Sequence, residues 1–334
     1  MLNANNPYRC IGKGFCGSVW AAEDGTNHAI KREDGGPGRS VTNDYNMHLQ
    51  IIRSANQHRP SMPLAIPQCQ SLIYSNNMWW VENLHRFPAG FTECRALISE
   101  RIPKMPRSIS DKLVDLFCAG NPSLSAFVKG NDDDDCCLIR PYLGRRRERE
   151  ANTSRFQRFS LRNVPLHINQ MEDLGLDYVA YAQTMADALA MMHWGAEVDA
   201  NDVEFVLAPP RASSTRASST RTSFPSHYLG EHVMWILDFD CVRHMSMDEA
   251  GLKQACAAFM RNDPFYPRPD GTATADGALW WFFKDRFLAT SAGILGDGSP
   301  HAGLPRRLME LIEEEGCRRR KRKEELQERD EDTE

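Results

Sequence analysis

The chain has 334 residues, 41% of them hydrophobic, which is enough for one large domain or two smaller units with cores of their own. Its 40 basic and 45 acidic residues give a net charge of −5, which argues against general nucleic-acid binding. The ten cysteines form no C-x-x-C pair and fit neither a zinc finger nor a disulfide framework, so we expect no zinc. No apolar run is long enough to cross a bilayer, and the N-terminus lacks the features of a signal peptide. We therefore expect a protein of the cytoplasm or the nucleus, without a membrane partner.

The first patterned stretch carries glycines at Gly12, Gly14 and Gly17, followed by Val19 and, further on, by Lys31. Three short strands are predicted around it: Tyr8–Gly12, Val19–Ala22 and His28–Arg32. The pattern G-x-G-x-x-G-x-V followed by A-x-K resembles the nucleotide-binding half of the protein-kinase-like fold. There a glycine hairpin covers the triphosphate and the lysine pairs with phosphates. Because a strand follows the glycines, a hairpin fits better than a dinucleotide-binding turn, and an ordinary glycine-rich hairpin is the alternative.

The next elements extend this comparison. Apolar residues recur at helical spacing over Val41–Arg53, which predicts an amphipathic helix carrying Asp44. In a kinase-like fold an acidic residue at this place pairs with the lysine; a solvent-facing aspartate is the alternative. Further strands are predicted at Ser71–Tyr74 and Met78–Val81.

The stretch from Ala96 to Pro103 resembles the last strand of a small lobe running into a hinge. In such a hinge, backbone groups near Glu100 and Ile102 would hydrogen-bond an adenine. Any strand that ends in proline looks similar, so this interpretation depends on the glycine loop and the lysine.

The second half of the chain opens with a short helix candidate at Asp111–Cys118, a strand at Cys137–Arg140 and a mixed-charge loop from Arg145 to Glu150. That loop is either solvent-exposed or a binding patch. A long helix with an apolar face is predicted from Leu176 to Leu189.

This helix leads into a loop and an apolar strand, the layout of the catalytic loop in kinase-like enzymes. Those enzymes use an aspartate that orients the acceptor hydroxyl and, five residues on, an asparagine that binds a metal. Asp199 and Glu204 occupy these positions, and a carboxylate is a hard ligand that suits Mg²⁺. Glu197 and Val198 replace the usual His-Arg, and a turn of helix-capping acids is the alternative.

A buried-type strand, His232–Leu237, ends at Asp238, which is placed like the metal-binding aspartate of the D-F-G motif. Asp240 stands where the glycine would be, a variant closer to aminoglycoside- and choline-kinase-like phosphotransferases. No activation segment follows, because Asp248–Met260 already looks helical.

Three further segments complete the chain. Residues 209–227 contain a five-residue Arg/Ser/Thr repeat, which predicts a disordered insertion, and its serines suit a basophilic kinase. In the turn Asn262–Pro269, either Asp263 caps a loop or the aromatic residues pack. After a terminal helix at Leu304–Glu315, the basic run Arg318–Lys323 is a nuclear localisation signal, a polyanion patch or part of a charged helix.

Several stretches together also look like a fungal family of unknown function often labelled "zinc finger protein", and the likeness spans residues 8–295. The stretches are Ser99–Pro103, Phe159–His167, Met192–Trp194, Asp199–Leu207, Trp235–Asp240 and Asn262–Pro269. Cysteine and histidine never occur at finger spacing, and the family has no assigned activity to transfer.

We therefore expect an α+β, two-lobed protein-kinase-like fold, with a small β-rich lobe over 1–103, a mainly helical lobe over 104–315 and a charged tail over 316–334. The first hypothesis for function is phosphoryl transfer from ATP with Mg²⁺, to a small-molecule or protein acceptor that the sequence does not identify. In it Lys31 binds phosphates, Asp44 orients Lys31, Asp199 positions the acceptor, and Glu204 with Asp238 holds the metal. The alternatives are an inactive ATP-binding pseudokinase or scaffold, and a nuclear adaptor that acts through the basic tail.

Overall fold

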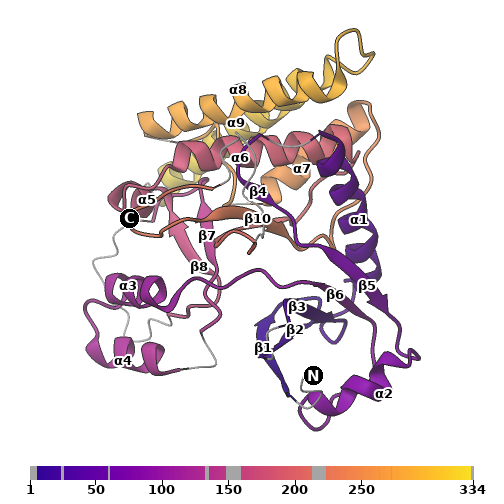
Figure 1. The fold of residues 1–334 in the computed structure, drawn as a ribbon. Coiled ribbons are helices and arrows are strands. Elements are labelled where there is room, and N and C mark those ends of the chain that lie inside the picture. The colour runs from indigo at the N-terminus through magenta and orange to yellow at the C-terminus, as the bar shows by residue number, and fades with distance from the viewer. Residues whose placement is uncertain are drawn as a thin grey trace.

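The computed structural model describes residues 6–23, 26–58, 61–131, 135–147, 159–212, 223–262, 264–271 and 273–331. Within them the chain is a mixed α+β structure built around two five-stranded sheets. In Figure 1 the first sheet lies toward the bottom, beside the N-terminus, and the second lies beneath a group of helices at the top. The repeat residues 213–222 of the predicted insertion and Asp263 lie outside the described residues.

The first sheet is antiparallel throughout, in the order β1-β2-β3-β6-β5. Its strands are β1 (Tyr8–Lys13), β2 (Ser18–Ala22), β3 (His28–Arg32), β5 (Cys69–Ile73) and β6 (Ala96–Glu100). The three N-terminal strands thus match the expected ones to within one residue at each end. Pairing of β3 with β6 sets Lys31 opposite Leu97 and His28 opposite Glu100, so the lysine and the start of the predicted hinge lie on neighbouring strands.

A small core of aromatic and aliphatic side chains covers one face of this sheet, and Trp20 packs there against Trp80 and its neighbours. Trp80 lies in helix α2 (Trp79–Asn83), where the sequence predicted a strand. The prediction was wrong because Asn77 accepts the Trp79 N–H with its side chain, at 2.8 Å, and so starts a helical turn. The turn buries Trp80 and leaves Met78 and Val81 exposed on its other face.

Helix α1 (Val41–His58) is longer than predicted and buries a different face. Apolar spacing indicated a stripe through Val41, Tyr45, Leu49 and Ile52, of which Val41 is buried and the other three are only partly buried. The buried positions are Val41, Asp44, Met47, His48, Ile51 and Ser54. Polar side chains lie on this face because α1 packs both on the first sheet and on the segments that follow the second sheet.

The second sheet is mixed, in the order β4-β10-β9-β7-β8. Its strands are β4 (Leu64–Ala65), β7 (Ile139–Tyr142), β8 (Val164–His167), β9 (Glu204–Ala208) and β10 (Val233–Leu237). β10 and β9 are antiparallel, with Leu237 opposite Glu204, whereas β4 runs parallel to β10 and β8 parallel to β7. The strand expected at Cys137–Arg140 starts two residues later, and β4 and β8 were not predicted.

Helices pack on the second sheet and form the large core of the molecule with it. They are α3 (Arg107–Phe117), α4 (Pro122–Gly130), α5 (Ile168–Asp173), α6 (Tyr178–Ala190), α7 (Glu249–Arg261), α8 (Thr274–Leu295) and α9 (Leu304–Glu331). Helix α6 is buried along most of its length and continues into a π-helical turn, Met191–Gly195, just before the predicted catalytic loop. No helix of the described residues is both long and apolar enough to span a bilayer.

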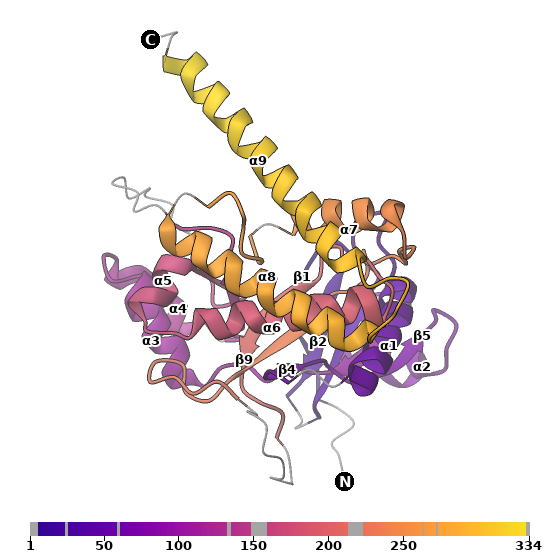
Figure 2. The ribbon, with the colours of Figure 1, turned by 90° about the horizontal axis from the view of Figure 1, so that it is seen from above.

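The C-terminal helix α9 runs through the predicted boundary at residue 315 and includes the basic run. Figure 2 shows its last turns extending away from the rest of the molecule. The basic run is therefore helical, and Arg318 and Arg319 both pair with Glu315.

Candidate functional site

A cavity of about 350 Å³ lies between the two sheets, beneath the glycine loop. It is lined by ten of the predicted site residues: Gly12, Gly14, Gly17, Val19, Lys31, Asp44, Glu100, Ile102, Glu204 and Asp238. Asp199 does not line it. The fold therefore brings together side chains from β3, α1, β6, β9 and the end of β10, which are far apart in the sequence.

The glycine loop joins β1 to β2 as a tight hairpin, closed by a 2.9 Å hydrogen bond from the Gly14 N–H to the Gly17 carbonyl. Its glycines serve different purposes. A Cβ on Gly17 would lie 2.0 Å from the Arg32 carbonyl oxygen and 2.6 Å from an Asp34 carboxylate oxygen, so only glycine fits there. A Cβ on Gly14 would meet no atom within 4 Å, so this position is open.

The segment after β3 holds the loop in place. The Asp34 carboxylate accepts hydrogen bonds from the Ser18 backbone N–H, at 2.7 Å, and from the Ser18 hydroxyl. Two glycine N–H groups then donate to loop carbonyls, from Gly35 to Cys16 at 3.1 Å and from Gly36 to Phe15 at 2.8 Å. The loop is thus tied to the residues that immediately follow the lysine strand.

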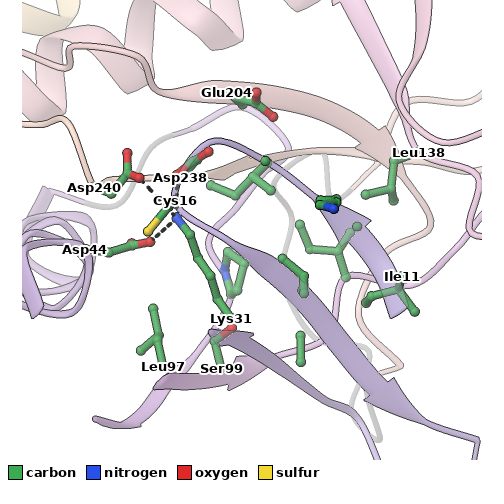
Figure 3. A pocket seen from close by; sticks show the side chains of 18 of the residues that line it. Ile11, Cys16, Lys31, Asp44, Leu97, Ser99, Leu138, Glu204, Asp238 and Asp240 are labelled. Carbon is green, nitrogen blue, oxygen red and sulfur yellow. Dashed lines mark hydrogen bonds and ion pairs between the residues drawn. The ribbon is translucent and has the colours of Figure 1, made fainter. Parts of the chain in front are cut away.

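The Lys31 ammonium group is the centre of the charged end of the cavity (Figure 3). It lies 2.5 Å from Asp44, 2.6 Å from Asp238 and 3.7 Å from Asp240. Burial lowers the pKa of Lys31, but the three carboxylates outweigh it and raise this pKa well above its ordinary value. Burial raises the pKa of Asp44, and the nearby lysine charge opposes that shift. The predicted Lys31–Asp44 pair is therefore formed, and a charged lysine is secure at neutral pH.

Helix α1 also forms hydrogen bonds with the segment that carries Asp238. The Asn43 side chain donates to the Asp240 carbonyl at 3.0 Å and to the Val242 carbonyl at 2.9 Å. The second carboxylate oxygen of Asp44 accepts the Phe239 N–H at 3.3 Å. Asp238 itself has φ 68°, a left-handed conformation that aspartate adopts more readily than most residues. Such a backbone persists because these contacts over-determine it, which is typical of functional sites.

Glu204 begins β9 and faces the cavity beside Leu237, its partner in the sheet. Arg140 of β7 forms an ion pair with its carboxylate. Burial raises the pKa of Glu204, the Arg140 charge lowers it, and the net direction is upward. A ligand that recruits this carboxylate must therefore share it with Arg140.

Asp199 is placed quite differently from its predicted neighbours, since it is buried outside the cavity. One carboxylate oxygen accepts the N–H groups of Asn201 at 3.1 Å and Arg243 at 2.9 Å. The other accepts the Gln254 side chain at 2.9 Å. With both oxygens satisfied by the protein, Asp199 braces the loop on which it lies.

That loop is strained, because Glu197, Ala200 and Asp202 all have positive φ angles between 53° and 63°. Asn262 fixes it from the other side: its amide accepts the Asp202 N–H at 2.7 Å and donates to the Ala200 carbonyl at 3.2 Å. The result of this bracing is that the side chain of Asp202, 52% exposed, is presented at the cavity wall.

Sequence reasoning missed several residues of the charged end. Asp202 and Asp240 lie here with Cys241, and their ligand atoms are within 4.8 Å of one another. Arg39 bridges the two carboxylates, at 2.9 Å from Asp202 and 2.7 Å from Asp240. Asp240 had a signal in the sequence, since it follows Asp238 at the end of a buried strand; Arg39 and Asp202 had none.

The other end of the cavity is an apolar slot between the sheets, and Figure 3 shows Ile11 and Leu138 on this side, away from the Lys31 cluster. Its apolar lining residues include Ile11, Val19, Ala29, Ile102, Leu138 and Leu237, whereas Leu97 lies nearer the Lys31 cluster. At its rim the Glu100 N–H already donates to the Gln68 carbonyl, at 2.8 Å. Among the hydrogen bonds of the described residues none involves the backbone of Ile102, so of the two predicted hinge residues this one has its backbone N–H available.

Comparison with known families gives one match. A model of a family of unknown function, described as "Zinc finger protein", matches residues 234–299, from β10 to just beyond the end of α8. This agrees with the likeness noted in the sequence over that segment. The segment contains only Cys241, His244 and Cys256 as cysteine or histidine ligands, too few for a four-ligand zinc site of its own. No curated protein matches the chain.

Proposed function

We propose that this chain is a divergent kinase-like protein, with a small β-rich lobe and a larger helical lobe, that binds ATP together with Mg²⁺. The observation that carries the proposal is the division of a single cavity into an apolar slot at one end and a charged cluster at the other. A nucleotide has the same division, with a flat heteroaromatic ring and a polyanionic tail.

The dimensions and the lining support a nucleotide. A volume of about 350 Å³ falls within the range of about 300–1,000 Å³ that is typical of small-molecule sites. Ile11 and Leu138 form opposite sides of the slot for a ring, and the open Gly14 lets a phosphate approach the loop backbone. Lys31, charged and held by Asp44, supplies the cation for the phosphates.

The donor set also suits a divalent cation. Lys31 and Arg39 face the four carboxylates of Asp44, Asp202, Asp238 and Asp240, so the charged end has an excess of two negative charges. Carboxylate oxygens are the ligands that Mg²⁺ prefers. Asp238 and Asp240 would hold the ion, with Glu204 nearby, and the ion would supply charge neutralisation for the phosphates.

Phosphoryl transfer is the second candidate function, and Asp202 is the observation that favours it. Asp199 is fully occupied in bracing its loop, whereas Asp202 projects from the same loop to the cavity wall and is half exposed. We propose that Asp202, rather than Asp199, orients the acceptor hydroxyl and receives its proton as the oxygen attacks the phosphate. Without an acceptor the same site would serve as the nucleotide sensor of an inactive, pseudokinase-like scaffold.

Binding is tested by titrating ATP into the full chain with and without Mg²⁺, by calorimetry and by thermal denaturation. At a free ligand concentration about a hundred times the dissociation constant, binding should raise the free energy of unfolding by about 2.7 kcal/mol. Lys31→Met should weaken MgATP binding at least about tenfold, the effect of losing roughly 1.4 kcal/mol of interaction. Lys253→Met, an exposed lysine of α7, is the matched control and should leave binding unchanged. Absence of binding by the wild type at millimolar nucleotide would end the proposal.

Transfer is tested separately, by following ATP turnover with metabolite and protein acceptors. Asp202→Asn should retain MgATP binding and lose turnover, whereas Asp199→Asn should lower stability first. A wild type that binds MgATP but turns over no faster than Asp202→Asn would support the inactive scaffold. The nuclear-adaptor alternative rests on the basic run of α9, and unchanged localisation after deletion of residues 318–323 would remove its basis.

A further inference from the structure

Arg39 belongs to the charged end, but neither the sequence patterns nor the proposed binding mode gives it a role. It lies in the segment between β3 and α1, the same segment that ties down the glycine loop through Gly35 and Gly36. One guanidinium nitrogen contacts both Asp202 and Asp240, and the group lies 5.7 Å from the centre of the Phe15 ring at the tip of the loop. Arg39 therefore connects the loop above the cavity with the acids below it.

The position of this guanidinium matters because of the acids it contacts. Asp240 is buried and is shared with Lys31, and a buried carboxylate requires a cationic partner. Asp202 and Asp240 are also two of the three side chains whose ligand atoms converge within 4.8 Å. A metal ion held by Asp240 competes with the guanidinium for the carboxylate oxygen that Arg39 contacts at 2.7 Å.

A polyphosphate could bind the Arg39 guanidinium once a metal ion has displaced it from the acids. Guanidinium groups bind phosphate with two parallel hydrogen bonds, as well as they bind carboxylates. Arg39 lies at the cavity wall beneath the glycine loop, where the phosphates of a nucleotide would extend from the slot past Lys31. When a cation and a polyphosphate enter together, each charged group gains a new partner: the acids gain the metal ion and Arg39 gains phosphate.

We propose that Arg39 is an internal counter-cation. It pairs with the acids of the ligand-free site and is exchanged for a divalent cation when a polyphosphate binds. This rests on the proposed function. The contact makes metal and nucleotide binding mutually dependent: the metal alone competes with Arg39, and the nucleotide alone draws Arg39 away from Asp202 and leaves Asp240 with only the more distant Lys31, at 3.7 Å. The free site thus excludes divalent cations until the phosphate-bearing ligand arrives, and positive coupling between the two ligands follows.

The experiment measures the affinity of the full chain for Mn²⁺ alone, by electron paramagnetic resonance, and for ATP with and without Mn²⁺. Arg39→Gln should bind Mn²⁺ alone at least about tenfold more tightly than the wild type, equivalent to about 1.4 kcal/mol. It should bind ATP less tightly and show weaker coupling between the two ligands. Arg39→Lys keeps the positive charge but lacks the planar guanidinium group, so its Mn²⁺ affinity should lie between those of the wild type and Arg39→Gln. Arg95→Gln, which removes a surface ion pair with Glu33 outside the cavity, is the control and should match the wild type.

The outcomes separate the two proposals. Nucleotide binding by the wild type with equal Mn²⁺ affinity in wild type and Arg39→Gln overturns the role of Arg39 and leaves the proposed function intact. No nucleotide binding overturns the proposed function, while tighter Mn²⁺ binding by Arg39→Gln still supports the counter-cation. Far-UV circular dichroism and a cooperative unfolding transition establish that each variant is folded. If Arg39→Gln does not fold, Arg39→Lys decides the question, because unchanged Mn²⁺ affinity in that variant overturns the proposal.

Discussion

Replacing Lys31 with methionine removes the ammonium group on which the charged end of the cavity depends. Asp44, with a side chain only 4% exposed, then has no ion-pair partner among the residues that the structure describes, and Asp238 and Asp240 lose their share of the same charge. Removing one partner of a buried pair costs about 3–5 kcal/mol, because the remaining charge is left without compensation. Asp238 is a third exposed and contributes less, so we expect the free energy of unfolding to fall by about 3 kcal/mol.

A double-mutant cycle with Asp44→Asn isolates the pair. The double variant no longer buries an unpaired Asp44 carboxylate, so it should be more stable than the sum of the single effects predicts, by about 1–3 kcal/mol. Urea unfolding at pH 7 measures each corner, with Lys253→Met as the control that changes stability by less than about 0.5 kcal/mol. Single effects that add to within about 0.5 kcal/mol would refute the coupling.

Acidification gives an independent check of the same reasoning. Burial already raises the pKa of Asp44 in the wild type, and loss of the Lys31 charge removes the main opposing influence. In Lys31→Met the folded state therefore binds a proton at a pH where the unfolded state does not. Its stability relative to the wild type should rise as the pH falls from 7 toward the ordinary aspartate pKa of about 4. A stability gap that stays constant over this range would contradict a charged, unpaired Asp44.

Two other predictions concern the loops near the cavity, and a third concerns the buried π-helical turn Met191–Gly195. Gly17→Ala should destabilise the protein by more than about 1 kcal/mol, since its Cβ would lie 2.0 Å from a backbone oxygen, whereas Gly14→Ala, with open space, should change stability by less than about 0.5 kcal/mol in urea unfolding. Asp199→Ala should lower the free energy of unfolding by about 1.5–3 kcal/mol, because it leaves buried donors unpaired. Asp202→Ala removes a half-exposed side chain and should lower it by less than about 1 kcal/mol. Equal losses of stability in the two variants would contradict the buried placement of Asp199 and the exposed placement of Asp202. Burial lowers the pKa of His193 to about 4, so the unfolded state binds its proton first on acidification, and stability should fall between about pH 6.5 and pH 4. His193→Gln should flatten that part of the pH profile, by up to about 3 kcal/mol for a shift of this size; an unchanged slope would show that other groups are responsible.

The sequence by itself determined the short-range features of this protein. Alternating and apolar runs located most strands of both sheets, because strand and hairpin signals are local. Glycine spacing located the loop over the cavity, and Lys31 and Asp238 stood out because each ends or follows a strand with a marked pattern. Where local signals compete, sequence reasoning failed: an aromatic run indicated a strand at 78–81, but Asn77 starts a helical turn that buries Trp80.

Only the tertiary structure decided which acids face the cavity. Asp199 and Asp202 lie three residues apart on one loop, and a sequence pattern assigns the chemistry to the first. The bracing by Arg243, Gln254 and Asn262 turns the first inward and the second outward. These partners lie more than forty residues further along the chain, so no local pattern contains them.

The role of Arg39 depends on the tertiary structure even more directly. It contacts Asp240 across 201 residues of sequence, and each residue taken alone is an ordinary charged side chain. Spacing in the sequence carries no information about such a pair, because it forms only when the first sheet and α1 meet the end of β10. The local sequence thus specified the loop and the strands that line the cavity. The packing of the two sheets against α1 determined which charged side chains meet there.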